Sequence, residues 1–540
     1  MSPIHPFIQT VEELKKGNHT VNTITLPPLK PTDINSLVAD TLGCDCVIAE
    51  PLTKLIAQKT KGNPFFTTQF LQGLHQDGYI TFNRNLGIWE CDIVQVRSLA
   101  LTDDVVTFMV QQLQKLPEST QIALQRAACI GAEFDLKTLA IICELREHQA
   151  ADALWPAIQA GLILPISDNY KFFHSQEEVE DEREIRVPYR FLHDRVQQAS
   201  YALIAEGQKQ SLHWTIGQLL LQNTPKSELE DRIFNIVNQL NQRGKEHLTV
   251  SEGCTLAELN LIAARKARQN TAYGTAYNNA RIGIDYLPAD AWQSQYSFTL
   301  ALHTITVETA YLSGEFAAME EWVAITLSHC QTILDRIPIQ ESKILACVAQ
   351  QKPSDAIAIG LESLKLLGVD IPFSPTDEQF QQALQTTLTQ MEEVGLENLL
   401  DLPAMDNPEI EAAAGILIKI GPACMCSNKL LYFMTTLTNM QLSLKHGHNA
   451  LSAIGYSNYV ILLNIVLKDF DTAFRLSDIA LELCQKFFSK AAAAQSLTMI
   501  GIFARHWKLH LRETLPLLRQ AREYGMESGE YDMTSWGYFN

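Results

Sequence analysis

The sequence is short of positive charge. Lys and Arg together number 42 among 540 residues, against 61 Asp and Glu, which gives a formal net charge of −19. A protein that binds phosphate backbones or anionic lipid without sequence specificity needs the opposite sign. We therefore expect neither a nucleic-acid partner nor an anionic membrane surface as the binding partner.

Cysteine is also sparse, with 11 residues in the chain. The closest pairs are Cys44 with Cys46 and Cys424 with Cys426, each separated by a single residue. No second Cys-x-x-Cys and no nearby His pair completes a zinc-binding pattern. We expect no metal site, and we interpret the cysteines as reduced thiols of a cytoplasmic protein.

The common catalytic and nucleotide-binding motifs are missing. The chain contains no G-x-x-x-x-G-K-[ST] loop to hold a triphosphate, and no G-x-G-x-x-G, H-E-x-x-H or G-x-S-x-G. His193-Asp194-Arg195 has the residues of a kinase catalytic loop in scrambled order, but no D-F-G follows. We expect no catalytic residue that acts within this chain alone.

Neither a signal peptide nor a clear membrane span is present. Met1–Thr10 lacks the basic and apolar regions of an export signal. The longest uncharged run, Gly447–Leu467, is long enough to cross a bilayer, but it carries a histidine and three asparagine residues that are costly in hydrocarbon. This run predicts a helix buried among other helices.

The first hundred residues alternate strand-like and helix-like patterns. Val21–Leu26 is rich in β-branched residues and stops at two prolines, which favours a strand. Gly62-Asn63-Pro64 separates two helical patterns, because glycine and proline interrupt helices. The other expected elements are helices over 33–42, 50–61 and 65–76, the first capped by Asp33, and a hairpin over 79–92 that turns at 83–87.

The next segment, 117–205, has the order of a winged helix: helices followed by short strands. It carries eight basic and fourteen acidic residues, the wrong balance for binding in a DNA groove. We expect this module to pack against protein instead. The expected helices cover 119–129, 136–144 and 148–161, and the expected strands cover 163–166, 170–173 and 187–192.

Beyond His213 the pattern is helical almost to the end of the chain. A small residue and an aromatic residue before a turn, followed by an alanine-containing helix, recur at irregular spacing, as in Ala272–Ala276, Ala310–Phe316 and Lys468–Ala473. Degenerate helical hairpins of an α-solenoid fit this pattern. An irregular helical bundle is the alternative.

Four segments in this order resemble the helical lid, winged helix and repeats of STAND-type signalling ATPases. The resemblance is strongest to the ATPase region of large multidomain proteins, common in cyanobacteria, that join serine/threonine kinase, AAA-like ATPase, GAF and sensor histidine kinase domains. It covers nearly the whole chain. The segments are KTKGNPFF at 59–66, LQRAACIGAEF at 124–134, YRFLHDRVQQASY at 189–201 and IFNIVNQLN at 233–241.

The resemblance implies a mainly α chain with three parts. These are the C-terminal remnant of an AAA-like α/β core with its helical lid (1–116), a winged-helix domain (117–205) and TPR-like helical repeats (206–540) that bind protein partners. A complete ATPase of this class needs a P-loop lysine, a Walker B acid and an arginine sensor, which would precede Met1. We therefore expect a fragment without measurable ATP hydrolysis of its own.

Two residues inherit roles in binding ATP or ADP from the resemblance. Pro64 matches the proline of the G-x-P element, whose ring packs against adenine. His193 matches the histidine of a Met-His-Asp element that reaches the β-phosphate of ADP, here within Leu192-His193-Asp194. Without any ligand, Pro64 would simply follow a helix-breaking turn, and His193 would satisfy backbone groups at a strand end.

Three functions remain open from the sequence. The first is the regulatory and sensor segment of a signalling ATPase linked to serine/threonine and histidine kinases. The second is a free-standing helical-repeat scaffold that binds a peptide or subunit. The third, a winged-helix transcription regulator, ranks last because of the acidic charge.

Overall fold

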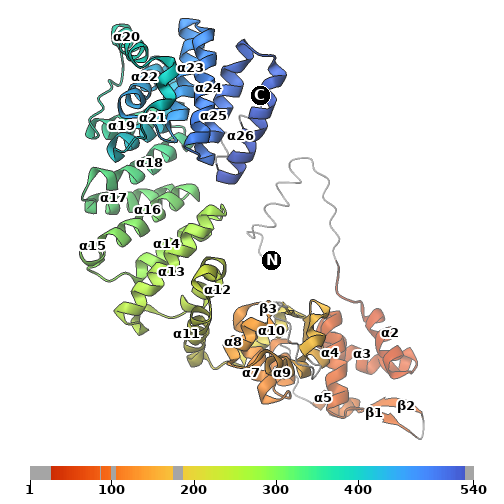
Figure 1. The fold of residues 1–540 in the computed structure, drawn as a ribbon. Coiled ribbons are helices and arrows are strands. Elements are labelled where there is room, and N and C mark those ends of the chain that lie inside the picture. The colour runs from red at the N-terminus through yellow and green to blue at the C-terminus, as the bar shows by residue number, and fades with distance from the viewer. Residues whose placement is uncertain (1–25, 85–86, 99–104, 174–185, 530–534, 536–540) are drawn as a thin grey trace. The chain divides into compact units, whose positions relative to one another are not determined.

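The computed structural model describes residues 26–84, 87–98, 105–173, 186–529 and 535. The chain divides into a first compact unit, Met1–Asn223, and a second, Thr224–Asn540. Helices dominate the described residues of both units (Figure 1), which confirms the predicted mainly α class. The prediction of an α/β core remnant with a strand at 21–26 lies outside the described residues, apart from Leu26.

The first unit opens with three helices and a hairpin. The hairpin lies where the sequence predicts it, with Phe82 opposite Trp89 in an antiparallel register. The first helix begins earlier than predicted: Asp33 is its third residue, and the Asp33 carboxylate accepts from the backbone N–H of Lys30 at 3.1 Å. The elements are α2 (Pro31–Leu42), α3 (Cys46–Thr60), α4 (Pro64–Gln76), β1 (Ile80–Asn83), β2 (Ile88–Cys91), α5 (Ile93–Ser98) and α6 (Val105–Leu113).

Helix α4 belongs to two hydrophobic clusters at once. Phe70, Leu71 and Leu74 pack with residues of α2 and α3 in one cluster. Phe66, one turn earlier, packs in a second cluster with residues of the following helices, among them Leu124 of α7. Side chains three and four residues apart lie on adjacent parts of a helix surface, so one helix can serve both clusters.

The second cluster encloses a three-stranded antiparallel sheet with the order β3-β5-β4. Two details of the prediction are wrong. Residues 170–173 form a 3₁₀ turn, in which Lys171 pairs with Asp168 at 2.8 Å, and the place beside β5 is taken by the unpredicted β3. The elements are α7 (Glu118–Ile130), β3 (Glu133–Asp135), α8 (Leu136–Cys143), α9 (Glu147–Gln159), β4 (Ile163–Pro165), η1 (Asp168–Phe173), β5 (Pro188–Phe191), α10 (Asp194–Ala202) and α11 (Glu206–Gln222).

In the second unit, helices pack mainly against their near neighbours in sequence, as in a helical-repeat array. Of the three recurring patterns, only Ala310–Phe316 spans a turn between two helices as predicted, whereas Ala272–Ala276 and Lys468–Ala473 lie mostly within the first turn of a helix. The elements are η2 (Lys226–Glu228), α12 (Leu229–Leu240), η3 (Lys245–His247), α13 (Val250–Gln269), α14 (Tyr273–Tyr286), α15 (Ala291–Ser294), α16 (Tyr296–Leu312), α17 (Phe316–His329), α18 (Ile333–Ala349), α19 (Pro353–Leu366), α20 (Asp377–Val394), η4 (Leu396–Asp401), α21 (Pro408–Ser427), α22 (Lys429–His446), α23 (Ser452–Leu462), the π-helix η5 (Leu463–Leu467), α24 (Phe470–Lys486), α25 (Lys490–Phe503), η6 (Arg505–Trp507), η7 (Leu511–Thr514) and α26 (Leu515–Ser528).

The long uncharged run forms α23 and η5, and α23 is almost entirely buried, as the sequence predicts. A different helix, α21, has the length and apolar composition that would allow it to cross a membrane. Half of its apolar window is buried within the unit, and core helices of water-soluble proteins have the same composition.

A buried histidine closes the α22–α23 connection. The backbone N–H of His448 donates to the carbonyl of Pro403, and the N–H of Met405 donates to the carbonyl of His448, both at 2.8 Å. The His448 ring is fully buried, with Nε2 2.9 Å from the Tyr456 hydroxyl oxygen. Burial, with a smaller contribution from Lys486, lowers the pKa of His448 to about 4.

This pKa predicts a loss of stability in acid. Between pH 6.5 and pH 4 the unfolded chain binds a proton at residue 448 that the folded chain does not bind, so the contribution of His448 to the free energy of unfolding decreases as the pH falls. The decrease is about 3 kcal/mol over that range. Urea unfolding of the wild type should show a steeper loss between pH 7 and pH 4 than His448→Gln. The exposed-site control His510→Gln should follow the wild type, and parallel profiles for all three would contradict the prediction.

Candidate functional site

The chain leaves the helical conformation between α3 and α4 because two residues there have left-handed backbone angles. Lys61 and Gly62 have positive φ angles of 49° and 78°. The Gly62 carbonyl accepts from the N–H of Leu29 at 2.8 Å, and a Cβ at position 62 would lie 2.6 Å from the Leu29 carbonyl oxygen. Only glycine fits this position without strain.

Pro64 is the first residue of α4, where its missing N–H costs no helical hydrogen bond. Asn63 caps the helix, because its side-chain oxygen accepts from the N–H of Phe66 at 3.2 Å. The Pro64 ring is exposed. The predicted helix break is therefore confirmed, and it leaves the proline on the surface at a helix N-terminus.

His193 lies at the start of another helix, in the capping position that Asn63 holds on α4. It follows β5 and caps α10, where its Nδ1 accepts from the N–H of Arg195 at 3.1 Å. The carboxylate of Asp194 lies against the same nitrogen. The histidine thus does satisfy a backbone group after a strand, as the ligand-free interpretation expects.

The structure brings these two regions together. The ring of Phe65 stacks on the imidazole of His193, with centroids 5.4 Å apart and planes 8° from parallel. Phe66 lies 5.0 Å from the same imidazole in a tilted arrangement. The residue after Pro64 therefore contacts His193, although the two are far apart in sequence. The family resemblance implies for Phe65 and Phe66 only that they fix the helix after Pro64, and the contact with His193 is not predicted.

One ring nitrogen of His193 remains available. In the tautomer in which Nδ1 accepts from the Arg195 N–H, the ring proton lies on Nε2, and in the protonated ring Nδ1–H faces the Asp194 carboxylate while Nε2 again carries a proton. Nε2 has no hydrogen-bond partner among the described residues. The side chain is 30% exposed. Nε2 can therefore donate a hydrogen bond to an anionic group that reaches the surface beside Phe65.

No ligand set for a metal ion occurs among the described residues, where no three His, Cys, Asp or Glu side chains gather at one point. All eleven cysteines are free thiols. Burial raises the pKa of several of them, to about 11 at Cys129 and about 12 at Cys424. A high thiol pKa makes these cysteines poor nucleophiles. The interactions that the region around Pro64, Phe65 and His193 offers to a ligand are therefore hydrogen bonds and ring contacts.

Comparison with known proteins finds similarity to signalling proteins. No protein-family model matches the chain. The chain is 21% identical over 588 aligned positions to "Hybrid signal transduction histidine kinase G" of Dictyostelium discoideum. This alignment covers 97% of the chain and 17% of that protein, so the chain spans about a sixth of the length of its relative. The sequence likeness thus extends over both units.

The comparison with solved structures also finds similarity. It is a Signal Transduction ATPase with Numerous Domains (STAND) protein with a tetratricopeptide repeat sensor, from Pyrococcus horikoshii. The identity is 12%, the match covers 96% of this chain and 69% of that one, and the TM-score is 0.32.

Proposed function

We propose that this chain is the regulatory part of a STAND-type signalling ATPase, with a nucleotide-contacting lid and winged helix followed by a helical-repeat arm that binds a protein partner in the cytoplasm. The sequence likeness to a signal-transduction histidine kinase along nearly the whole chain supports a signalling role. The observation that carries the proposal is the stacking of Phe65 on His193. It joins the two regions that the family resemblance assigns to one nucleotide.

The residues present suit the two ends of ADP. The exposed Pro64 ring offers an apolar surface to the base, and Nε2–H of His193 offers a donor to a phosphate oxygen. The N-termini of α4 and α10, which carry partial positive charge, both belong to this region. The P-loop lysine, which supplies most of the phosphate affinity in such ATPases, is not in this sequence. Binding by this chain should therefore be weak.

The second unit provides the partner-binding arm in this proposal. Helical repeats expose long surfaces because each helix packs mainly on its neighbours. Trp507, Leu511 and Leu515 are exposed apolar residues near its end, as expected of a protein contact. The kinase activity named for the Dictyostelium protein belongs to a chain about six times longer. For this chain we propose a link to kinase signalling through a larger parent, and no kinase activity of its own.

Saturation-transfer NMR with millimolar ADP tests the nucleotide site. His193→Asn keeps a side chain that caps helices well but removes Nε2, so we expect ADP to bind about tenfold more weakly. Its matched control is His510→Asn, since His510 caps η7 through Nδ1 in the same way, with the Arg512 N–H at 3.1 Å. Pro64→Ala should weaken transfer to the adenine protons, whereas Pro353→Ala, at the first position of α19, should not.

Two results would contradict the nucleotide role. One is an absence of saturation transfer from the wild-type chain. The other is an equal loss in His193→Asn and His510→Asn. ATP turnover by the purified chain that disappears in the Pro64→Ala/His193→Ala double variant would contradict the expected lack of hydrolysis.

The free-standing scaffold is the second candidate, favoured by the same exposed apolar residues. The size of the native product separates the two. A band far above 60.5 kDa on a denaturing gel, detected with an antibody against the helical repeats, supports the regulatory part of a larger ATPase. A band at that mass supports the scaffold.

A further inference from the structure

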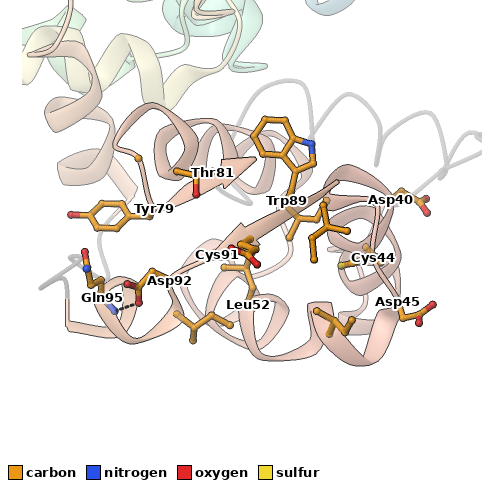
Figure 2. A pocket seen from close by; sticks show the side chains of 18 residues that line it. Asp40, Cys44, Asp45, Leu52, Tyr79, Thr81, Trp89, Cys91, Asp92 and Gln95 are labelled. Atoms are coloured by element: carbon orange, nitrogen blue, oxygen red, sulfur yellow. Dashed lines mark hydrogen bonds between the residues drawn. The ribbon is translucent and has the colours of Figure 1, made fainter. Parts of the chain in front are cut away.

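A cavity of about 1190 Å³ lies in the first unit, away from Pro64 and His193. It is bounded by the turn between α2 and α3, by the β1–β2 hairpin and by the start of α5 (Figure 2). Buried Leu52 of α3 and half-buried Cys91 of β2 lie near its centre. The nucleotide proposal assigns no role to this cavity.

The charge of the cavity has one sign. Its lining includes four carboxylates and no Lys, Arg or His. Figure 2 shows Asp40 and Asp45 at one end and Asp92 at the other. Asp92 accepts from the N–H of Gln95 at 3.0 Å. None of the ion pairs in the described part of the chain involves these carboxylates, and Lys54 of α3 pairs instead with Glu50 at 2.8 Å. The four negative charges are Asp40, Asp45, Glu90 and Asp92.

Aliphatic side chains lie open beside these charges. Ile48, which lines the cavity from the first turn of α3, is 65% exposed. Ile88 of β2, which also lines the cavity, is 38% exposed. Exposed aliphatic residues grouped beside a cavity are typical of a docking surface, because their burial contributes favourable free energy on binding.

We propose that this cavity docks a basic amphipathic peptide segment of another protein, with an aliphatic side chain against Ile48 and Leu52 and its Lys or Arg side chains facing Asp40, Asp45, Glu90 and Asp92. Charge complementarity selects the occupant. Carboxylates at both ends of one cavity suit two cationic side chains carried on one backbone. A second copy of this chain, with a net charge of −19, is the wrong partner for the same reason.

Fluorescence anisotropy with the intact chain tests the proposal. The probe is a short fluorescein-labelled peptide in which leucine and arginine recur at helical spacing. Two matched peptides replace every arginine by glutamine or every leucine by serine. We expect the probe to bind, both matched peptides to bind more weakly, and added salt to weaken binding by the probe.

The variant Asp40→Asn/Glu90→Gln removes two carboxylates whose side chains have no hydrogen bond or ion pair within the described residues. We expect it to bind the probe about tenfold more weakly. Its control, Glu118→Gln/Glu133→Gln, makes the same change of charge on α7 and β3 and should bind like the wild type. Thermal unfolding of both variants, followed by circular dichroism, confirms that each remains folded.

Several outcomes would overturn the proposal. These are no binding of the probe, equal binding of the serine-substituted peptide, and an equal effect of the two double variants. Self-association of the chain that Asp40→Asn/Glu90→Gln abolishes would make a second copy the occupant. Pro64 and His193 do not line this cavity, so the proposal does not depend on the nucleotide site. Pro64→Ala and His193→Asn should therefore leave binding of the probe unchanged.

Discussion

Replacing Gly447 by alanine is expected to lower the free energy of unfolding of the Thr224–Asn540 unit by about 4 kcal/mol. Gly447 ends α22 with φ 90° and ψ −165°, a conformation essentially restricted to glycine. A Cβ at this position would lie 2.2 Å from the carbonyl oxygen of Pro403. That oxygen accepts from the N–H of His448, so moving it away breaks the buried connection to α23.

The control for this change is Gly274→Ala in the same unit. Gly274 lies in the first turn of α14, is exposed, and a Cβ there would meet no atom within 4 Å beyond its chain neighbours and its own helix. Alanine should therefore stabilise the helix, by up to about 1 kcal/mol. Hydrogen–deuterium exchange, measured on peptides from α22 and α23, reports on this unit separately from the other. Equal protection in the two variants would contradict the expected clash.

The second large effect is expected from Phe66→Ala in the other unit. Phe66 is 7% exposed and packs in the cluster that holds the three-stranded sheet. Removing the ring leaves a cavity and should cost about 3–5 kcal/mol. It also removes one of the two rings that contact His193. We therefore expect both faster amide exchange in α7 and α10 and weaker saturation transfer to ADP.

Phe82→Ala provides the comparison for this variant. Phe82 lies in the hairpin and is 48% exposed, so its loss should cost less than about 1 kcal/mol. Exchange in the Thr224–Asn540 unit should not change in either variant, since neither side chain belongs to that unit. Loss of protection confined to α4 in Phe66→Ala would mean that the ring does not support the sheet.

Local features of the fold are predictable from the sequence. The hairpin over 79–92 follows from β-branched and aromatic residues on either side of a turn. The break at Gly62-Asn63-Pro64 follows from residues that interrupt or begin helices, and the structure adds that Asn63 is the cap. The helices after His213 follow from composition. In each case a few neighbouring residues determine the backbone.

Features that depend on tertiary packing are not predictable in this way. Tyr170–Phe173 is aromatic and looks like a strand, but the position beside β5 belongs to β3. That strand is three residues long and carries two acidic side chains, so no periodicity marks it. Its existence depends on pairing with β5, which follows more than fifty residues later.

The candidate site shows the same division. Pro64 and His193 are identified through a family resemblance. Each lies at the start of a helix, and the neighbouring residues in the sequence account for that local geometry. The stack of Phe65 on His193 depends on the approach of α4 to the start of α10, which no local pattern encodes. The acidic cavity has no signal in the sequence, because its carboxylates come from two separate parts of the chain, 40–45 and 90–92, and form no motif.

The double role of α4 also restricts how its length can change. Phe66 contacts one hydrophobic cluster, and Phe70, four residues later, contacts the other. Inserting one residue between them would turn the second half of the helix by about 100° relative to the first. Either the sheet-side cluster or the cluster of α2 and α3 would then lose the phenylalanine ring that α4 contributes to it. Homologous chains should therefore keep the Phe66–Phe70 interval free of insertions and deletions while tolerating them in the hairpin loop nearby.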